Sequence, residues 1–497
     1  MTTSQDKKVL IFIVAFNAEK HIERVLARIP PRIFTHYDYH ILLIDDSSSD
    51  TTFTVAKLYQ ALHGDVRLTV LSNPDNLGYG GNQKLGYHYA IQHDYDIVVL
   101  LHGDGQYAPE LLEDMLAPLL AGTADVVLGS RFLRVRAALR GGMPLYKYLG
   151  NRILTGIQNA LLGTHLSEFH SGYRAYSVAA LRRIPFERNS NDFHFDTQIL
   201  IQLLNAGCTI QEIAIPTYYG DEICHVNGVR YAWNVVKATL LSRAHTLSIL
   251  YQREYDAGTD PEERYTPKLG YPSSHTLAVD AVPERSRVFE LGCNQGHVSQ
   301  ELRRKGCYVV GCDALPLRHP DRVDEFHLID LNRPEHLPAL DRFDVILLLD
   351  VLEHLDDPER FLDTLRARIK RGSPRVIITT PNVAFFIIRF QLLFAQFNYG
   401  RQGILDLTHK RLFTFQSLKK LCLGAGYRIL AARGIPAPFP KAIGLNGLSR
   451  FLLRLNGWLI RLSRGLFSYQ IYLEVRATPV VGELLSHAFT ESSRRES

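Results

Sequence analysis

The stretch "DIVVLLHGDGQY" at residues 96–107 joins a buried-strand pattern to a glycine turn that carries polar side chains. The run 97–101 is continuously apolar, which is typical of a strand covered on both faces of a parallel sheet. Open α/β sheets bind their ligands where such strands end. Asp104 and Gln106 stand there, and their oxygens are ligands that suit Mg²⁺ or Mn²⁺. We therefore predict a metal site at these two residues.

His102 precedes this turn and leaves two interpretations open. Its neutral imidazole would bind Mn²⁺ beside Asp104, or its ring would pack at the end of the strand. The first interpretation adds a ligand to the metal site. The second leaves that site with Asp104 as its one carboxylate, where an Asp-x-Asp motif would supply two.

The pattern of strand, turn and helix recurs in two series along the 497 residues, which indicates an α/β protein with two domains. The polar, turn-rich stretch from Tyr251 to Ser274 separates the two series. We expect a first domain at 1–250, a linker at 251–284, a second domain at 285–480 and a disordered tail at 481–497. The six cysteines form no CxxC pair, which favours reduced thiols in a cytoplasmic protein.

Two further motifs of the first series suit a nucleotide. "IDDSSSDTT" at 44–52 places Asp45 and Asp46 at the end of a strand, where carboxylates accept hydrogen bonds from a base or a ribose. "NPDNLGYGGNQKLG" at 73–86 is a glycine-rich turn before a helix, where backbone amides approach a diphosphate. An N-cap with a surface acid is the plainer explanation of the first motif.

The order of "AFNAEKHI", "IDDSSSDTT", "NLGYGGNQKLG", "HGDGQYAPE", "GSRF" and "SGYRAYS" resembles family 2 glycosyltransferases of the GT-A fold, on the dolichyl-phosphate mannosyltransferase branch. The resemblance covers about Lys8–Leu250 and implies inverting transfer of a sugar from a nucleotide-sugar donor. It implies that Asp104 and Gln106 hold the metal and that Arg131 takes part in catalysis. The donor-binding residues that it implies are Phe16, Asn17, Asp45, Asp46, Gly80 and Arg174. A buried Arg174 would instead hold loops together.

The acceptor decides whether this reaction needs a general base. A sugar hydroxyl needs one, and Asp196 in "FHFDTQI" is the first candidate, followed by Glu168. A polyprenyl phosphate is already anionic and needs none. The basic stretch 131–140 suits such a phosphate, or it forms a solvated charged face.

The second series begins with "VFELGCNQGHVSQEL" at 288–302, a strand, a glycine turn and a helix. This motif departs from the G-x-G-x-x-G of dinucleotide dehydrogenases. With "DVLEHLDDP" and "TTPN", it resembles class I S-adenosylmethionine-dependent methyltransferases over about Ser286–Pro479, a Rossmann-like fold. The cofactor-binding residues that the resemblance implies are Glu290, Gly292, Gly296, Asp313, Asp330 and Asp350. Asn294 stands where the family commonly has glycine, so the loop is expected to differ slightly.

Methylation of an oxygen acceptor also calls for a base, and His354 and His409 are the candidates. Either histidine would alternatively form hydrogen bonds within its own loop.

The C-terminal region concentrates positive charge, with 13 Lys or Arg and two acids between Gly400 and Val480. Projected as a helix, Leu448–Leu466 separates an arginine stripe from a Leu, Phe and Trp face. This face would cover the methyltransferase sheet, or it would lie on an anionic membrane surface. No accompanying motif supports nucleic acid as a partner.

These observations predict a bifunctional bacterial enzyme of surface polysaccharide or glycolipid synthesis. The first domain would transfer a sugar to a glycan or lipid-linked acceptor with Mg²⁺ or Mn²⁺, and the second would methylate with S-adenosylmethionine. Two alternatives remain: a polyprenyl-phosphate glycosyltransferase with an independent methyltransferase, or a nucleotide-binding scaffold whose first domain is inactive. The enzyme is expected in the cytoplasm, either free or at the inner face of the membrane.

Overall fold

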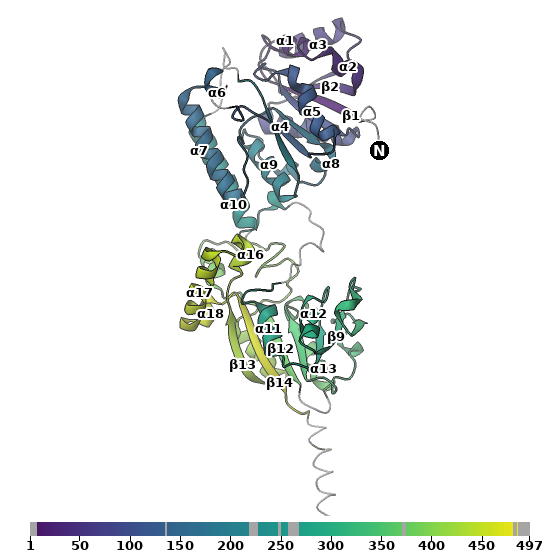
Figure 1. Cartoon of the computed structure of the whole chain (residues 1–497), viewed down its shortest axis with the longest axis vertical. Helices are drawn as coiled ribbons and strands as arrows, with labels where there is room; N and C mark the ends of the chain where they lie inside the picture. The colour runs from purple at the N-terminus through teal and green to yellow at the C-terminus, as the bar shows by residue number, and fades with distance from the viewer. Residues whose placement is uncertain are drawn as a thin grey trace, which may run out of the picture. The chain divides into compact units, whose positions relative to one another are not determined.

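The computed structural model describes residues 7–134, 137–217, 227–246, 250–256, 268–369 and 374–480, together with Leu485. The chain forms two compact units (Figure 1), the first comprising 1–246 with 252–261 and the second 247–251 with 262–497. Each unit contains one seven-stranded sheet. Apart from Leu485, the expected tail at 481–497 lies outside the described residues.

The first unit is built on a mixed sheet with the strand order β3-β2-β1-β4-β6-β5-β7. Strand β6 is antiparallel to its neighbours β4 and β5, and the other pairs are parallel. The strands are β1 (Lys8–Ala15), β2 (Asp38–Asp45), β3 (Leu68–Ser72), β4 (Ile97–His102), β5 (Val126–Ser130), β6 (Arg174–Ser177) and β7 (Ile210–Ala214).

Successive apolar side chains of β1 point to opposite faces of the sheet, so helices must pack against both faces. Val9, Ile11 and Ile13 belong to one buried cluster, whereas Leu10 and Phe12 belong to another. Helices α1, α3 and α5 supply the first cluster, and α4, α8 and α9 the second. The helices of this unit are α1 (Ile22–Ala27), α2 (Pro31–His36), α3 (Thr52–Leu62), α4 (Tyr79–Gln92), α5 (Leu112–Leu120), α6 (Ala137–Arg140), α7 (Leu145–Leu162), α8 (Val178–Leu181), α9 (Phe195–Asn205) and α10 (Gly228–Thr246).

The second unit has the strand order β10-β9-β8-β11-β12-β14-β13, in which β14 is antiparallel to both neighbours. Its strands are β8 (Arg287–Leu291), β9 (Tyr308–Asp313), β10 (Glu325–Leu328), β11 (Val345–Leu349), β12 (Arg375–Pro381), β13 (Tyr427–Ile435) and β14 (Gln470–Ala477). Its helices are α11 (Ser274–Ala281), α12 (His297–Arg304), α13 (Pro358–Ala367), α14 (Phe386–Leu393), α15 (Phe415–Gly424), α16 (Phe439–Ile443), α17 (Gly447–Leu462) and α18 (Arg464–Phe467). Both sheets confirm the predicted α/β class.

Helix α11 lies within the range that the sequence assigned to a linker. Ser273 caps it by accepting a hydrogen bond from the Thr276 amide at 3.2 Å. Ala278 and Val282 are fully buried in the core of the second unit. The helix is only eight residues long, too short to be stable alone, so it depends on packing against the sheet beside it.

Within the described ranges, no helix combines the length and the apolar character needed to cross a membrane.

Close packing of α4 against β1 yields a stability prediction at Gly86. A Cβ atom at this position would lie 2.1 Å from Cε1 of Phe12, inside a fully packed core. We expect Gly86→Ala to lower the free energy of unfolding of the first unit by about 1–3 kcal/mol. Guanidinium unfolding, followed by pulsed labelling of the buried Cys208 thiol and mass spectrometry, measures this change.

Gly150→Ala is the matched control. Gly150 lies inside α7, and a Cβ atom there would have no neighbour within 4 Å among the described residues beyond the backbone of its own helix. Alanine at this position is expected to stabilise the helix by about 0.5–1 kcal/mol. Equal effects of the two substitutions would contradict the packing argument.

Candidate functional sites

The carboxyl ends of three adjacent parallel strands meet at one edge of the first sheet. Ala15 at the end of β1 pairs with Asp45 of β2, and Val14 pairs with His102 of β4. The three motifs that follow these strands therefore lie close together. They are "AFNAEKHI" after β1, "IDDSSSDTT" at the end of β2 and the Asp104 turn after β4. The sequence predicted that each of these motifs follows a strand, and the strand order places them side by side.

Asp104 and Gln106 are both half-buried in the turn after β4. Oδ1 of Asp104 accepts a hydrogen bond from the Gln106 amide at 2.9 Å. Among the described residues, no hydrogen bond reaches the other carboxylate oxygen. This oxygen and the Gln106 amide oxygen fit the donor preference of Mg²⁺ or Mn²⁺.

His102 packs at the end of β4. Its Nε2 lies 3.1 Å from the hydroxyl of Tyr79, and that hydroxyl donates to Asp196 Oδ2 at 3.0 Å. Nε2 of His102 is therefore the donor to Tyr79. Burial lowers the pKa of His102, so the ring is neutral at neutral pH. These contacts favour the packing interpretation of His102.

A hydrogen bond joins the motifs "AFNAEKHI" and "IDDSSSDTT" beside the exposed ring of Phe16. Asn17 has a φ of 49°, and its Oδ1 accepts a hydrogen bond from the Ser49 amide at 3.0 Å. Asp45 accepts a hydrogen bond from the Ser48 amide at 3.2 Å. Phe16 is 45% exposed, which leaves its ring available to a planar group.

Asp46 and Gly80 hold the polypeptide in place. The buried carboxylate of Asp46 accepts hydrogen bonds from the amides of Leu77 and Gly78, each at 2.9 Å. The Gly80 amide donates to the Asn191 carbonyl at 2.8 Å, and a Cβ on Gly80 would lie 2.5 Å from the Ser190 carbonyl oxygen. We expected Gly80 to bind the donor, but its amide is already used and its missing side chain allows close packing.

Arg174 is fully buried and acts as the loop staple that the sequence left open. It donates to the carbonyl oxygens of Ser171, Asp196 and Phe169 at 2.7–2.8 Å. Because backbone oxygens occupy the guanidinium, the structure favours this alternative over the predicted binding of the donor. Asp196 is also buried, and it accepts a hydrogen bond from Gln83 at 3.1 Å. The sequence carried no signal for the partners Tyr79 and Gln83, which come from α4.

Arg131 and Glu168, two further predicted residues, form a buried ion pair. Nε of Arg131 donates to Glu168 Oε1 at 3.0 Å, and the Arg131 amide donates to Oε2 at 2.8 Å. Asn151 of α7 donates a further hydrogen bond to Glu168 Oε1 at 2.9 Å. Glu168 is therefore saturated with hydrogen bonds, which makes it a poor candidate for a general base.

The second sheet presents an equivalent edge at β10, β9, β8 and β11. Glu290 of β8 is buried and accepts a hydrogen bond from the Ser299 hydroxyl of α12. Burial raises the pKa of Glu290 to about 7. Asp313 is half-buried at the end of β9, and Asp330 is exposed just beyond the neighbouring β10.

Alternate residues of the loop after β8 have a left-handed backbone conformation. Gly292 and Gly296 have φ values of 71° and 70°, and Asn294 between them has a φ of 47°. Asparagine tolerates this region better than most residues. Its amide donates to Asp313 Oδ2 at 2.8 Å, so the departure from glycine keeps a compact loop.

Asp350 is held by protein groups on both carboxylate oxygens. Gln470 donates to Oδ1 and Oδ2 at 2.9 and 2.8 Å, Thr379 donates to Oδ1 at 2.8 Å, and Lys268 lies 3.0 Å from Oδ2. Burial opposes ionisation, but the charge of Lys268 and the hydrogen bonds from Lys268 and Thr379 lower the pKa of Asp350 to about 2. We expected Asp350 to bind the cofactor, but it cross-links β11, β12, β14 and the segment before α11.

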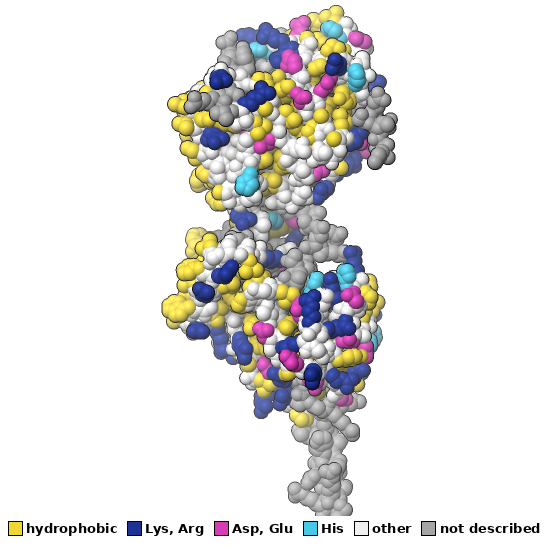
Figure 2. All heavy atoms as spheres, viewed as in Figure 1, with side chains coloured by type: hydrophobic (Ala, Val, Ile, Leu, Met, Phe, Trp, Pro, Cys, Tyr) yellow, Lys and Arg dark blue, Asp and Glu magenta, His cyan; other side chains and the backbone are white. Residues whose placement is uncertain are grey.

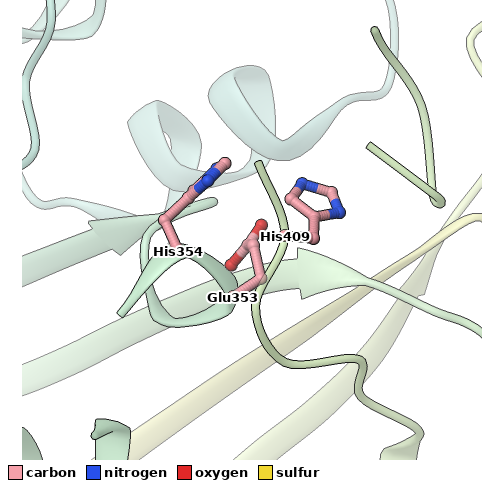
Figure 3. A group of neighbouring side chains, drawn as sticks. All are labelled: Glu353, His354 and His409. Atoms are coloured by element: carbon pink, nitrogen blue, oxygen red, sulfur yellow. The ribbon is translucent and has the colours of Figure 1, made fainter. Parts of the chain in front are cut away.

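His354 and His409 lie together, with ring centroids 4.8 Å apart. Glu353 joins them (Figure 3), although no role was predicted for it from the sequence. Burial and the charge of Asp350 raise the pKa of Glu353 well above its ordinary value. Glu353 and His354 are adjacent in sequence, but His409 comes from a loop that only the fold brings near.

Comparison with known proteins agrees with the two-unit architecture. Residues 10–184 match the family model "Glycosyl transferase family 2", and residues 268–432 match the model "Methyltransferase domain". The chain therefore combines a family 2 glycosyltransferase domain with a methyltransferase domain, and it is a transferase.

The relatives that match part of this chain include three polyprenyl-type sugar transferases. The UDP-N-acetylglucosamine–dolichyl-phosphate N-acetylglucosaminyltransferase of Methanococcus voltae is 27% identical, over 44% of this chain and 88% of that protein. The polyprenol monophosphomannose synthase of Mycolicibacterium smegmatis is 26% identical, over 43% of this chain and 78% of that protein. The undecaprenyl-phosphate mannosyltransferase of Micrococcus luteus is 27% identical, over 42% of this chain and 82% of that protein.

The raised pKa of Glu290 predicts a pH-dependent stability of the second unit. The folded unit favours the protonated carboxyl, so this stabilisation is complete below pH 4.5 and is lost as the pH rises through about 7. We expect Glu290→Gln to raise the free energy of unfolding by about 3 kcal/mol at pH 8 and to change it little at pH 4.5. Guanidinium unfolding followed by labelling of the buried Cys312 thiol measures both values.

Glu335→Gln, at an exposed carboxylate of the same unit, is the control and is expected to have little effect at either pH. A Glu290→Gln effect that is the same at pH 4.5 and pH 8 would contradict the assignment.

Proposed function

We propose that this chain, in which a family 2 glycosyltransferase domain and a methyltransferase domain are joined, is a bifunctional enzyme. The first domain transfers a sugar, with inversion, from a nucleotide-sugar to a lipid-linked acceptor, with polyprenyl phosphate favoured over a free glycan. The second methylates a hydroxyl of the product or of a related glycan. Surface polysaccharide or glycolipid synthesis in a bacterium is the proposed setting.

One observation carries the transferase proposal: the exposed Phe16 ring, the Asp45 carboxylate and the Asp104 turn follow three adjacent strand ends. Phe16 would stack on the nucleobase, and Asp45 would accept from the nucleoside. Asp104 and Gln106 would hold Mg²⁺ or Mn²⁺, which neutralises the charge that develops on the leaving diphosphate. The Arg131–Glu168 pair positions the adjoining loops.

The three relatives support the choice of acceptor, because their names specify dolichyl phosphate, polyprenol or undecaprenyl phosphate. A phosphate oxygen is already anionic and attacks the anomeric carbon without a general base. The burial of Asp196 and the saturation of Glu168 agree with such an acceptor. Of the basic stretch that would bind this phosphate, residues 135 and 136 lie outside the described residues.

The methyltransferase proposal depends on the second strand edge. Asp313 and Asp330 would accept hydrogen bonds from the ribose and the adenine amino group of S-adenosylmethionine, and the loop at Gly292–Gly296 would pass close to the cofactor. The cofactor supplies an activated methyl group. His354 and His409 would take the proton from the acceptor hydroxyl.

Helix α17 supports attachment to an anionic membrane surface. Asn456 anchors its inner side by accepting from the Ala437 amide at 2.8 Å and donating to the Phe467 carbonyl at 2.9 Å. Its outer side exposes a large apolar stripe and arginines, and Figure 2 shows hydrophobic side chains gathered there. The exposed residues are Leu448, Arg450, Phe451, Arg454, Leu455, Trp458, Arg461 and Leu462. The apolar face therefore does not simply cover the sheet.

The donor site is tested by calorimetric titration of UDP, GDP, dTDP and CDP into the full chain, each with Mn²⁺ and with a chelator. We expect one nucleotide to bind with Mn²⁺, and Asp104→Ala to weaken its binding at least about tenfold because a metal ligand is lost. Asp65→Ala, at an exposed acid, is the control. Nucleotide binding that is equal with Mn²⁺ and with the chelator, and equal in the parent and in Asp104→Ala, would support the inactive nucleotide-binding scaffold instead.

The corresponding radiolabelled nucleotide-sugar then identifies the acceptor. Label transferred to undecaprenyl phosphate and extracted into organic solvent supports the proposed acceptor. Transfer only to a soluble glycan would replace it with a sugar hydroxyl, and no transfer to either would contradict the transferase proposal.

Membrane attachment is tested by sedimenting the full chain with vesicles of phosphatidylglycerol or of phosphatidylcholine. We expect binding to the anionic vesicles, weakened about 100-fold by Phe451→Asp with Trp458→Asp, because two apolar side chains no longer enter the interface. Leu328→Asp, an exposed apolar position on β10, is the control. Sedimentation that is unchanged in the double variant would contradict a role of α17.

A further inference from the structure

Glu353 is a buried acid that the proposed mechanism does not use. The residue is 1% exposed, and neither carboxylate oxygen has a hydrogen-bond partner among the described residues. Burial of such a group without a partner is costly, and nearly all buried polar groups in proteins are paired. The two basic residues that follow His409 do not supply the missing partner. Lys410 pairs with Asp356 at 2.6 Å, and Arg411 pairs with Glu359.

The histidines beside Glu353 present lone pairs in a fixed tautomer. Nδ1 of His354 lies 3.2 Å from the Thr408 carbonyl oxygen, and Nδ1 of His409 lies 3.0 Å from the Ile404 carbonyl oxygen. A carbonyl only accepts, so each Nδ1 carries the proton and each neutral ring keeps a lone pair on Nε2. Metal-binding histidines commonly have this arrangement, with the other nitrogen donating to a carbonyl.

The backbone also fixes the distance between the two segments. The Glu353 carbonyl accepts hydrogen bonds from the amides of Lys410 at 2.7 Å and Arg411 at 3.1 Å. One ligand atom from each of Glu353, His354 and His409 lies within 4.8 Å of the other two. In Figure 3 the carboxylate lies between the two rings. Both rings are half-buried, so the group is reachable from solvent.

We propose that Glu353, His354 and His409 bind a divalent transition-metal ion, Zn²⁺ or Mn²⁺. Two imidazoles and one carboxylate are a donor set for such ions that leaves coordination positions open for other ligands. The ion supplies the cation that the buried carboxylate lacks. An acceptor hydroxyl bound at an open position would lose its proton to water more readily. Water would then replace His354 and His409 as the base, because their Nε2 lone pairs hold the ion, and this use of the ion rests on the proposed methyltransferase function.

Metal binding itself is tested without any activity measurement. The full chain carrying Asp104→Ala, which silences the proposed site of the first domain, is dialysed separately against Zn²⁺ and Mn²⁺, and bound metal is quantified by mass spectrometry. We expect one ion per chain, with binding weakened at least about tenfold by Glu353→Gln, because a charged ligand becomes neutral. Asp356→Asn removes an exposed carboxylate nearby and is expected to leave the affinity unchanged.

Glu353→Gln also distinguishes a role of Glu353 as a metal ligand from a purely structural role. Glutamine keeps the shape of the protonated carboxyl, so a structural role would survive the substitution. We expect the guanidinium concentration at which half of Cys312 is labelled to be equal or higher in the metal-free variant than in the parent. His409→Gln, which replaces a different ligand, serves as the second variant if the first does not fold. Equal affinity in parent and variants, or no binding of either ion up to about 1 mM, would overturn the proposal while leaving the methyltransferase function open.

Discussion

The structure depends on the burial of parallel strands from both faces. In β1 and β4 every second side chain enters one core and the others enter a second core, so neither strand has a polar face. Buried strands of this kind leave little room for charged groups along their length. Polar side chains of the candidate sites therefore gather at the last residues of the strands and in the turns that follow, and adjacent parallel strands bring these positions to one edge. The same constraint operates in both units.

At these edges, carboxylates perform two different tasks. Asp104 and Asp330 retain exposed or half-buried oxygens that a ligand can reach. Asp46 and Asp350 instead accept several hydrogen bonds from the protein and hold loops in place. Both kinds of carboxylate are needed, because a turn that presents a ligand atom must itself be fixed. Removal of the second kind would disturb binding indirectly through loop position.

Buried charge in the first unit follows the same logic. The Arg174 guanidinium is surrounded by backbone carbonyl oxygens. Arg131 is paired with Glu168, whose carboxylate also accepts a hydrogen bond from Asn151. Such pairs contribute modestly to net stability but are costly to break, so they specify one loop arrangement. The exception in the second unit is Glu353, whose carboxylate has no such match among the described residues.

The sequence by itself determined the α/β class, the two-part organisation and the strand ends at which polar residues gather, because apolar runs and glycine turns are local signals. It did not determine which of these residues face a ligand. Asp46 and Asp104 look alike in sequence, yet one binds backbone amides that lie more than thirty positions away, as the tertiary structure shows. Tertiary structure likewise decided that α11 is a core helix, that α17 exposes its apolar stripe and that His409 meets Glu353. Each depends on contacts between segments distant in the chain, and local sequence carries no record of such contacts.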